Sequence, residues 1–307
     1  MYPSKPSVHS IATRPIATFS IVAADLATGD LGIAVASKFL ACGAVVPWAS
    51  AGAGAVATQS YSNTAYGPDG IALMREGVSA ADALARLVAA DPGRDLRQAA
   101  MVDARGGAAA HTGSGCLDWA GHRVGAGFSC QGNILVGEEP VVAMAATFQS
   151  ASGALSERLL KSLAAGDAAG GDRRGRQAAA IYVVRAKGGY GGMNDVLVDL
   201  RVDDHPDPLN ELRRLADLQD LYFGQSPPKE KCRLEGAVLA ELRRMMHSVG
   251  RYQVASGGAW DGPWDEPTRQ ALDAFLSTEN LEERADLTAR TIDQPALAFL
   301  RAQFKTR

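Results

Sequence analysis

A pair of β-branched, apolar runs that begins at Thr18 constrains this chain more than any other feature of its sequence. The runs Thr18–Ala24 (TFSIVAA) and Leu31–Lys38 (LGIAVASK) flank Asp25–Asp30 (DLATGD), which is rich in turn-forming residues. Runs of this kind around a short turn predict a β-hairpin. Residues 1–17 hold three prolines and no apolar segment of the kind that a secretion signal carries, so we expect a flexible leader there.

The order of the remaining patterns predicts sheets covered by helices. Strand patterns occur at 54–59, 98–103, 107–112, 127–131, 177–186 and 195–203, and helix patterns at 69–76, 79–90, 140–150, 154–165 and 208–222. Strands and helices do not alternate one by one, as they do in a doubly wound fold, so an α+β or layered α/β domain is expected. The segment Pro47–Ser50 is a poor strand candidate.

The composition changes after the last of these helices. Residues 224–231 (GQSPPKEK) are polar with two prolines, which is typical of a linker. Beyond them, helix patterns occur at 234–249, 266–276 and 295–304, and no strand is predicted. A chain of 307 residues is long enough for about two domains. We therefore expect a leader (1–17), a main domain (18–224), a linker (225–232) and a small all-α domain (233–307).

The bulk properties exclude several classes of function. A net charge of −3 provides no field that favours nucleic acid or an anionic membrane. No apolar stretch approaches the ~18 residues of a membrane-spanning helix. The cysteines form no C-x-x-C pair and are typical of buried thiols in a reducing compartment, so a cytoplasmic location is expected.

Two motifs that resemble cofactor or metal sites do not have the required context. Gly52–Ala57 (GAGAVA) matches G-x-G-x-x-A, but no predicted strand precedes it and no helix follows, so close strand packing explains it better than dinucleotide binding. His111, Cys116 and His122 are spaced too widely for a structural zinc site and lack a fourth ligand. We expect neither a cofactor nor a metal.

Polar residues at the ends of two predicted strands are candidates for a site. Ser37 and Lys38 are neighbours on one strand and point to opposite faces, so they do not form a dyad, although one or both remain site candidates. Asp172–Arg176 (DRRGR) leads into another strand, and its guanidinium groups suit a carboxylate ligand. The alternative for this segment is a solvated charged loop.

Thr18 is a candidate nucleophile. An N-terminal threonine supplies both the attacking hydroxyl and an amine that acts as its general base, with no histidine needed. The first position of a strand suits this chemistry, provided that the leader is removed. The alternative is that Thr18 is only a β-forming residue.

Several ordered motifs resemble a bacterial family of unknown function with an N-terminal-nucleophile (Ntn) hydrolase-like fold. They are TFSIVAADLATGDLGIAVASKF (18–39), VVPWASAGAGAVATQSYSN (45–63), YGPDG (66–70), HTGSGCLDWAGH (111–122), QGNIL (131–135) and GDRRGRQ (171–177). The resemblance implies a four-layer αββα sandwich with Thr18 in the position of the nucleophile. Members usually begin Met-Thr-Phe-Ser, whereas Ala17 precedes Thr18 here, so only cleavage of the Ala17–Thr18 bond frees its amine.

The same resemblance implies that the protein hydrolyses a small amide or peptide. The Thr18 hydroxyl attacks the carbonyl, and an amide side chain or backbone N–H groups stabilise the oxyanion. The implied catalytic residues are Thr18, Ser37, Lys38, Gln59 and Asn133, with Gln131 as a further candidate, and the implied substrate-binding residues are His111, Asp172, Arg173 and Arg174.

The C-terminal segment resembles helical peptidoglycan-binding modules. Trp260–Leu272 (WDGPWDEPTRQAL) is similar to their D-G-x-x-x-x-x-T-x-x-A-L pattern, which implies a glycine turn leading into a capped helix. The resemblance implies cell-wall fragments as ligands or a role in dimerisation, and we expect a homo-oligomer. A non-catalytic binding protein on the same scaffold is the alternative to a hydrolase.

Overall fold

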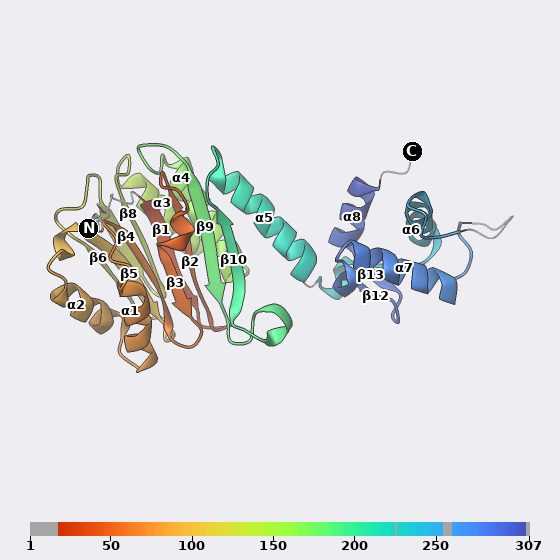
Figure 1. Ribbon diagram of the computed structural model, residues 1–307, viewed down its shortest axis with the longest axis horizontal. Helices are drawn as coiled ribbons and strands as arrows, with labels where there is room; N and C mark the ends of the chain where they lie inside the picture. Colours follow the sequence, from red (N-terminus) through yellow and green to blue (C-terminus); the bar gives the residue numbers. More distant parts are fainter. Residues whose placement is uncertain (1–17, 225, 254–259, 305–307) are drawn as a thin grey trace, which may run out of the picture. The chain divides into compact units, whose positions relative to one another are not determined.

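The computed structural model describes residues 18–224, 226–253 and 260–304 and divides into two compact units, Met1–Arg213 and Arg214–Arg307 (Figure 1). Each unit is described by itself. The leader expected at residues 1–17 lies outside the described residues. The division falls within α5 (Pro208–Phe223).

The predicted hairpin is confirmed, and it forms the centre of a six-stranded antiparallel sheet. β1 (Thr18–Asp25) pairs with β2 (Asp30–Ser37) from Thr18 opposite Ser37 to Asp25 opposite Asp30. The strand order is β10-β9-β2-β1-β8-β7. The other strands are β7 (Gly121–Gly125), β8 (Phe128–Asn133), β9 (Ala178–Val184) and β10 (Val196–Val202). No strand had been predicted at β7.

A four-stranded antiparallel sheet has the order β3-β4-β5-β6. Its strands are β3 (Pro47–Ser50), β4 (Gly54–Ser60), β5 (Arg97–Asp103) and β6 (Ala108–Thr112). The expectation that Pro47–Ser50 is not a strand is wrong, because β3 is an edge strand and Pro47 is its first residue, where a missing N–H is tolerated. Gly54 begins β4 so close to β5 that a Cβ there would lie 2.5 Å from the Val102 carbonyl oxygen.

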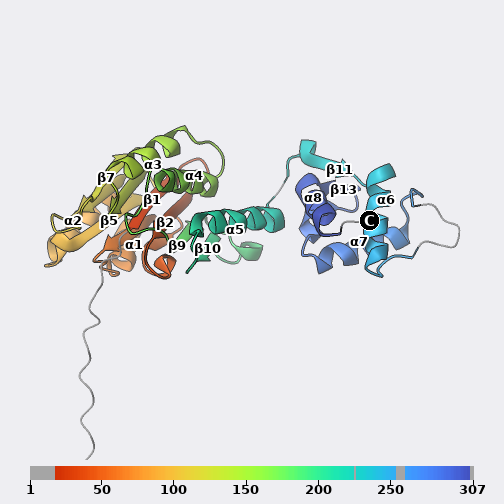
Figure 2. The ribbon, with the colours of Figure 1, turned by 90° about the horizontal axis from the view of Figure 1, so that it is seen from above.

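Helices cover the outer faces of the two sheets (Figure 2). α3 (Glu139–Ser150) and α4 (Leu155–Ala168) pack against β1, and α1 (Tyr66–Arg75) and α2 (Ala80–Ala90) pack against the sheet of β4 and β5. The helix predicted at 69–76 begins three residues earlier, because Pro68 fits the first turn of a helix. Ser79 caps α2 as predicted, accepting a hydrogen bond from the Asp82 backbone N–H at 3.1 Å.

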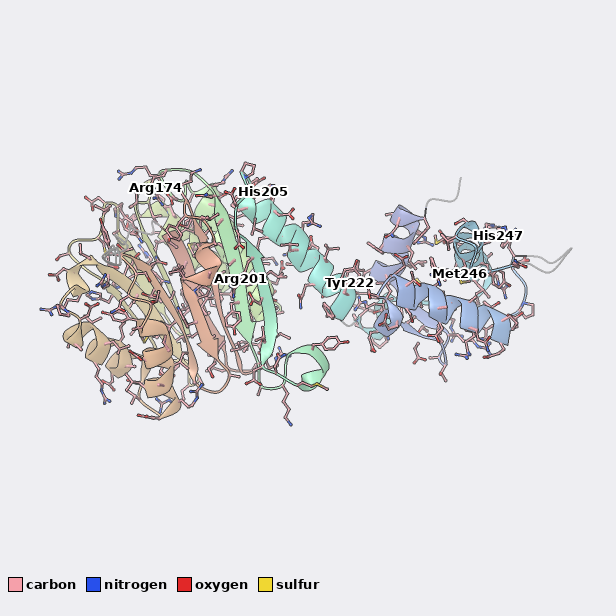
Figure 3. The ribbon with its side chains drawn as sticks, viewed as in Figure 1. Arg174, Arg201, His205, Tyr222, Met246 and His247 are labelled. Atoms are coloured by element: carbon pink, nitrogen blue, oxygen red, sulfur yellow. The ribbon has the colours of Figure 1, made fainter. Side chains whose placement is uncertain are left out.

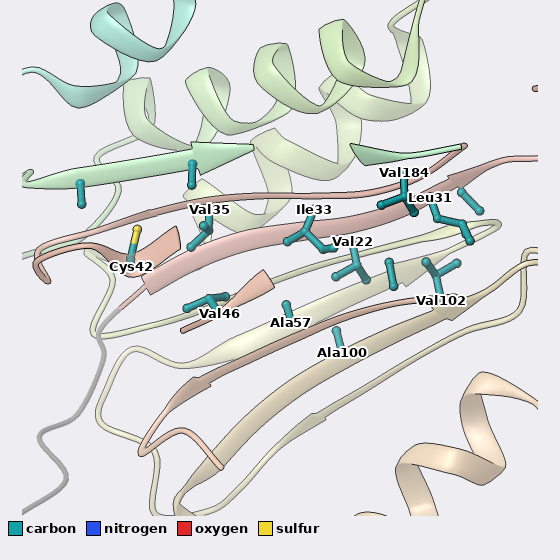
Figure 4. Close-up of a cluster of buried hydrophobic side chains, with 14 residues drawn as sticks. Val22, Leu31, Ile33, Val35, Cys42, Val46, Ala57, Ala100, Val102 and Val184 are labelled. Carbon is teal, nitrogen blue, oxygen red and sulfur yellow. The ribbon is translucent and has the colours of Figure 1, made fainter. Parts of the chain in front are cut away.

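Apolar side chains from the facing sheets fill the space between them (Figure 4). Because side chains alternate along a strand, Val22 of β1 faces this layer while Phe19 and Ile21 point to the helices. The buried cluster includes Val22, Leu31, Ile33, Val35, Ala57, Ala100, Val102 and Val184. Toward the Thr18 end of the strands the same layer becomes polar, and the candidate site lies at this end.

The C-terminal unit contains α6 (Gly236–Ser248), α7 (Glu266–Thr278) and α8 (Gln294–Gln303). The expectation of an all-α domain is wrong, because β11 (Lys231–Arg233), β13 (Thr291–Asp293) and β12 (Ala285–Asp286) form a three-stranded sheet. These strands have only two or three residues each, too few to produce an alternating pattern.

A buried arginine holds the loop before α7 in the C-terminal unit. Arg243 is 2% exposed and donates hydrogen bonds to the carbonyl oxygens of Trp260, Gly262 and Pro263 and to Thr268 Oγ1. A buried guanidinium group is tolerated only when its donors are satisfied. Arg243 therefore fixes the glycine turn that the sequence pattern predicted.

Within the described residues, no helix is long and apolar enough to cross a bilayer.

Candidate active site

Thr18 is the first residue of a central strand and lies between two polar residues of the neighbouring strands. It is opposite Ser37 of β2 on one side and Asn133 of β8 on the other. Thr18 Oγ1 donates a hydrogen bond to Ser37 Oγ at 3.1 Å, and all three side chains are buried. The structure thus brings together three of the predicted catalytic residues.

A buried layer of amide and hydroxyl groups lies beside Thr18 between the two sheets. Ser20 Oγ donates to Gln59 Oε1 at 2.6 Å and accepts from Gln131 Nε2 at 2.7 Å. Gln59 Nε2 lies 3.3 Å from the Thr18 carbonyl oxygen. The predicted residues Gln59 and Gln131 therefore belong to the layer, and Ser20 is a member that the sequence analysis missed.

Gln98 of β5 is the hub of this layer and was also missed. Its Nε2 donates to the Gly132 carbonyl at 2.7 Å, to Thr112 Oγ1 at 3.0 Å and to the Gly121 carbonyl at 3.1 Å. Its Oε1 accepts from Gln59 Nε2 at 2.8 Å and from Asn133 Nδ2 at 3.0 Å. The acceptors around Nε2 fix which way the Gln98 amide points, and hence which way its partners point.

Asn133 therefore presents its amide oxygen away from Gln98. Among the described residues, Asn133 Oδ1 has no hydrogen-bond partner, although the side chain is fully buried. Leaving a buried acceptor unsatisfied costs about 1–3 kcal/mol, so such an atom calls for a functional explanation. An acceptor next to Thr18 in the sheet is suited to a cationic or N–H donor at the reacting position.

Lys38 and Asp172 serve the site indirectly. Lys38 is exposed while Ser37 is buried, and Lys38 Nζ donates to the Arg176 carbonyl oxygen at 3.1 Å, away from Thr18. Asp172 Oδ2 accepts from the Lys38 backbone N–H at 2.9 Å. Asp172 thus ties the end of β2, and with it Ser37, to the arginine-rich loop.

The guanidinium groups of that loop bind partners within the chain. Arg173 donates to the Asp118 carbonyl at 2.8 Å, Arg174 pairs with Asp172 at 3.0 Å, and Arg176 pairs with Asp167 at 2.7 Å. Their geometry supports a loop-ordering role at least as well as the predicted role in holding a substrate carboxylate.

An open cavity of about 390 Å³ adjoins this loop and is lined by Asp167, Gly170, Asp172, Gly175, Arg176 and Pro206. A smaller space of about 10 Å³ shares part of this lining and continues to Phe19 and Ser37. That space holds about one water molecule. The smaller space therefore reaches the end of β2 at Ser37, and Thr18 lines neither space.

His111 of β6 and His122 of β7 lie together but apart from Thr18. His111 Nε2 is 2.9 Å from the Arg94 carbonyl oxygen, and His122 Nδ1 is 2.8 Å from Thr112 Oγ1. Burial, followed by the charge of His111, lowers the pKa of His122. His111 does not contact Thr18 directly, so no contact with Thr18 supports its predicted role in substrate binding. Within the described part of the chain, no three His, Cys, Asp or Glu side chains are grouped as metal ligands.

Asp91 forms a separate buried charge cluster behind α1, and it makes stability depend on pH. It accepts from Arg97 Nε at 2.9 Å, Asn63 Nδ2 at 3.0 Å and the Gly93 backbone N–H at 2.7 Å. Burial raises the pKa of Asp91, but these donors outweigh it and hold the pKa well below its usual value. The stabilisation is therefore complete above the unfolded-state pKa of about 4 and is lost as pH falls below it.

We expect Asp91→Asn to lower the free energy of unfolding by about 2–4 kcal/mol at pH 7, because Arg97 loses its charged partner. The difference from the wild type should shrink as pH falls from 4 toward 2.5. Urea unfolding at several pH values measures it, with exposed Asp69→Asn as a control that shifts stability by less than about 1 kcal/mol. A difference that stays constant down to pH 2.5 contradicts the assignment.

Comparisons with known proteins agree with the motifs in both parts of the chain. Residues 18–212 match the family described as "Family of unknown function (DUF1028)", and residues 222–300 match the one described as "Putative peptidoglycan binding domain". The crystal structure of a DUF1028 protein from Silicibacter pomeroyi is similar, with a TM-score of 0.61 and 32% identity over 68% of this chain and 88% of that chain. No curated protein matches the sequence. The resemblances to a family of unknown function and to a peptidoglycan-binding module are thereby confirmed.

Proposed function

The chain belongs to the family of unknown function DUF1028, and from that membership and the surroundings of Thr18 we propose that its first unit is an Ntn-type amidohydrolase. Its substrate is a small amide or peptide, and its nucleophile is Thr18 after residues 1–17 are removed. The sheets and their outer helices correspond to the four-layer αββα sandwich of Ntn hydrolases in this proposal.

One observation carries the proposal: the hydrogen bond of 3.1 Å from Thr18 Oγ1 to Ser37 Oγ at the first residue of a central strand. Any buried hydroxyl needs a partner, so the distinguishing feature of Thr18 is its place at the start of a central strand between Ser37 and Asn133. Here the hydroxyl is held in place, and the unsatisfied Asn133 oxygen lies opposite on β8. A fixed nucleophile beside a vacant buried acceptor suits a site that is completed by a new ammonium group.

Removal of the leader uses the same hydroxyl in this proposal. Thr18 Oγ attacks the Ala17 carbonyl carbon, the C–N bond breaks, and the Thr18 nitrogen takes up the hydroxyl proton as it becomes an amine. Water then hydrolyses the resulting ester, which releases residues 1–17 as a carboxylic acid and restores the Thr18 hydroxyl. Asn133 Oδ1 accepts a hydrogen bond from the new ammonium group.

In the hydrolysis of a substrate, bonds form and break in the same order. The Thr18 amine takes the hydroxyl proton as Oγ attacks the substrate carbonyl, and the resulting ammonium donates it to the departing amine. Water, activated by the Thr18 amine, hydrolyses the acyl-enzyme. The amide of Gln59, which contacts the Thr18 carbonyl, is a positioning group for this residue.

The C-terminal domain indicates which class of substrate the hydrolase would meet. Its match to a peptidoglycan-binding family favours cell-wall fragments, which contain peptide and amide bonds, as ligands. The cavity beside the arginine-rich loop, which shares part of its lining with the small space that reaches Ser37, has the volume range of small-molecule sites.

The test is the intact mass of the protein produced without an N-terminal tag, compared with that of Thr18→Ala. A mass lower by residues 1–17 in the wild type, and a full 307-residue mass in the variant, is the expected result. If both proteins keep the full mass, self-processing is wrong. If both lose the leader, another protease removes it and Thr18 is not required for that step.

A second function, ligand binding without catalysis, is favoured by the arginine-rich loop. Each of its guanidinium groups has a partner within the chain, which suits a stable scaffold as well as a reactive site. A full-length mass in both proteins, together with unchanged binding of soluble cell-wall fragments by Thr18→Ala, would favour this function.

A further inference from the structure

The six-stranded sheet ends on one side in β10. In the described part of the chain, β9 is hydrogen-bonded to one edge of β10 and no strand is paired with the other. An unpaired edge presents a row of N–H and C=O groups to any strand that fits it. Edge strands therefore carry either features that block pairing or features that select one partner.

The sequence of β10 is self-complementary about Leu200. Val198 and Val202 are at equal distances on either side of it, and Asp199 and Arg201 are adjacent to it with opposite charges. In an antiparallel pair of two β10 strands related by a twofold axis at Leu200, each Asp199 faces the Arg201 of the other copy, and each Val198 faces a Val202. Opposite charges and apolar side chains in direct cross-strand positions stabilise such pairs.

The charged side chains are available for this pairing. Asp199 and Arg201 are both exposed, and they project from the same face of the strand, where they bond each other at 2.7 and 3.1 Å. Figure 3 labels Arg201 on β10. A strand without opposite charges at the facing positions leaves this carboxylate and this guanidinium group unmatched. A second copy in the register centred on Leu200 matches both at once, so the charges select the partner.

The hairpin that leads into β10 also carries exposed apolar groups. Tyr190 and Met193 are 83% and 89% exposed, and both are large side chains that proteins usually cover. They lie just before β10 in the chain, at the end of the edge where a paired strand from a second copy continues past Val202.

We infer that β10 is a self-pairing edge: a second copy of this chain adds its β10 antiparallel, in the register centred on Leu200, to form a dimer with a continuous twelve-strand sheet. This inference does not depend on the proposed hydrolase activity.

Charge reversal tests it through the dimer dissociation constant of the full chain, measured by sedimentation equilibrium or light scattering over a dilution series. Asp199→Arg and Arg201→Asp each place like charges opposite one another at both symmetric positions, so each should weaken dimerisation about tenfold or more. The double variant Asp199→Arg/Arg201→Asp restores opposite charges across the axis and should recover dimerisation to within a few-fold. Arg105→Asp, in the turn between β5 and β6, makes the same change in net charge as Arg201→Asp and should leave the dissociation constant unchanged.

Circular dichroism and thermal melting separate folding from pairing in these variants. A wild type that stays monomeric at about 100 µM overturns the inference. So does a dimer that neither single variant weakens, because the Asp199–Arg201 pair then acts only within one chain. A double variant as weak as the singles overturns the register.

Discussion

A chain made to begin at Thr18 is expected to hydrolyse small amides, and Thr18→Ala in the same chain is expected to be slower by at least about a thousandfold. Production as Met followed by residues 18–307 lets ordinary methionine removal expose the threonine, which bypasses the leader. The variant loses the nucleophile while keeping the free amine. Release of 4-nitroaniline or of ammonia from a panel of amino-acid and dipeptide amides measures the rate.

Two matched variants separate chemistry from packing. Thr18→Val preserves the shape of the side chain and should be as slow as Thr18→Ala, whereas Thr18→Ser preserves the hydroxyl and should retain much of the activity. Loss of the buried hydrogen bond to Ser37 should lower the stability of the valine variant by about 1 kcal/mol, visible in thermal melting. Equal activity of the valine variant and the wild type rules out Thr18 as the nucleophile, whatever happens to the leader.

Replacing Gln98 by leucine is expected to lower the free energy of unfolding by about 3–5 kcal/mol. The change preserves size but removes the hub of the polar layer. It removes the side-chain donor to the Gly132 carbonyl, the acceptor of Asn133 Nδ2 and the closer of the two acceptors of Gln59 Nε2. Urea unfolding, followed by circular dichroism, measures the loss.

The same substitution at a half-buried glutamine outside the polar layer provides the control. Gln177 hydrogen-bonds only one side chain, Asp204, among the described contacts, and Gln177→Leu should cost less than about 1 kcal/mol. In the chain that begins at Thr18, Gln98→Leu should also reduce hydrolysis below that of Gln177→Leu, because the Asn133 amide is no longer oriented. A Gln98→Leu protein as stable as the wild type contradicts the role of Gln98 as hub.

The elements that the sequence predicted well are those in which local pattern and tertiary environment agree. The hairpin at 18–37 has β-branched residues on both faces, because one face packs on helices and the other on the second sheet. The cap of α2 at Ser79 follows from the same agreement, since its hydrogen bond lies within one turn.

The elements that were missed depend on partners distant in the chain. β3 begins with a proline and becomes a strand because β4 offers it an edge, and β7 (GHRVG) has no apolar alternation because it is the outermost strand. The strands of the C-terminal unit are too short to leave a pattern. In each case, pairing with a neighbouring strand outweighs the weak β-propensity of the local sequence.

In the candidate site, too, the residues that depend on distant partners could not be predicted from the sequence. Thr18, Ser37 and Asn133 were identified through the motifs and are neighbours in the sheet. Gln98 was missed because a single glutamine in a strand has no sequence signature, and its role depends on contacts with residues up to 39 positions away. Arg174 was predicted to bind a ligand, but its pairing with Asp172 depends on the loop conformation and could not be inferred from composition.

The pairing of β1 has a consequence for the order of events during synthesis. β2 follows β1 directly and can pair with it as soon as both leave the ribosome, but β8, which carries Asn133, is made more than a hundred residues later. At about 5–20 residues per second, Thr18 therefore waits several seconds or longer for its second neighbour. If the proposed self-cleavage requires that neighbour, a nascent chain keeps its leader until well over a third of its length has been translated. The new N-terminus is then exposed only on chains in which β1 has both of its neighbouring strands, β2 and β8.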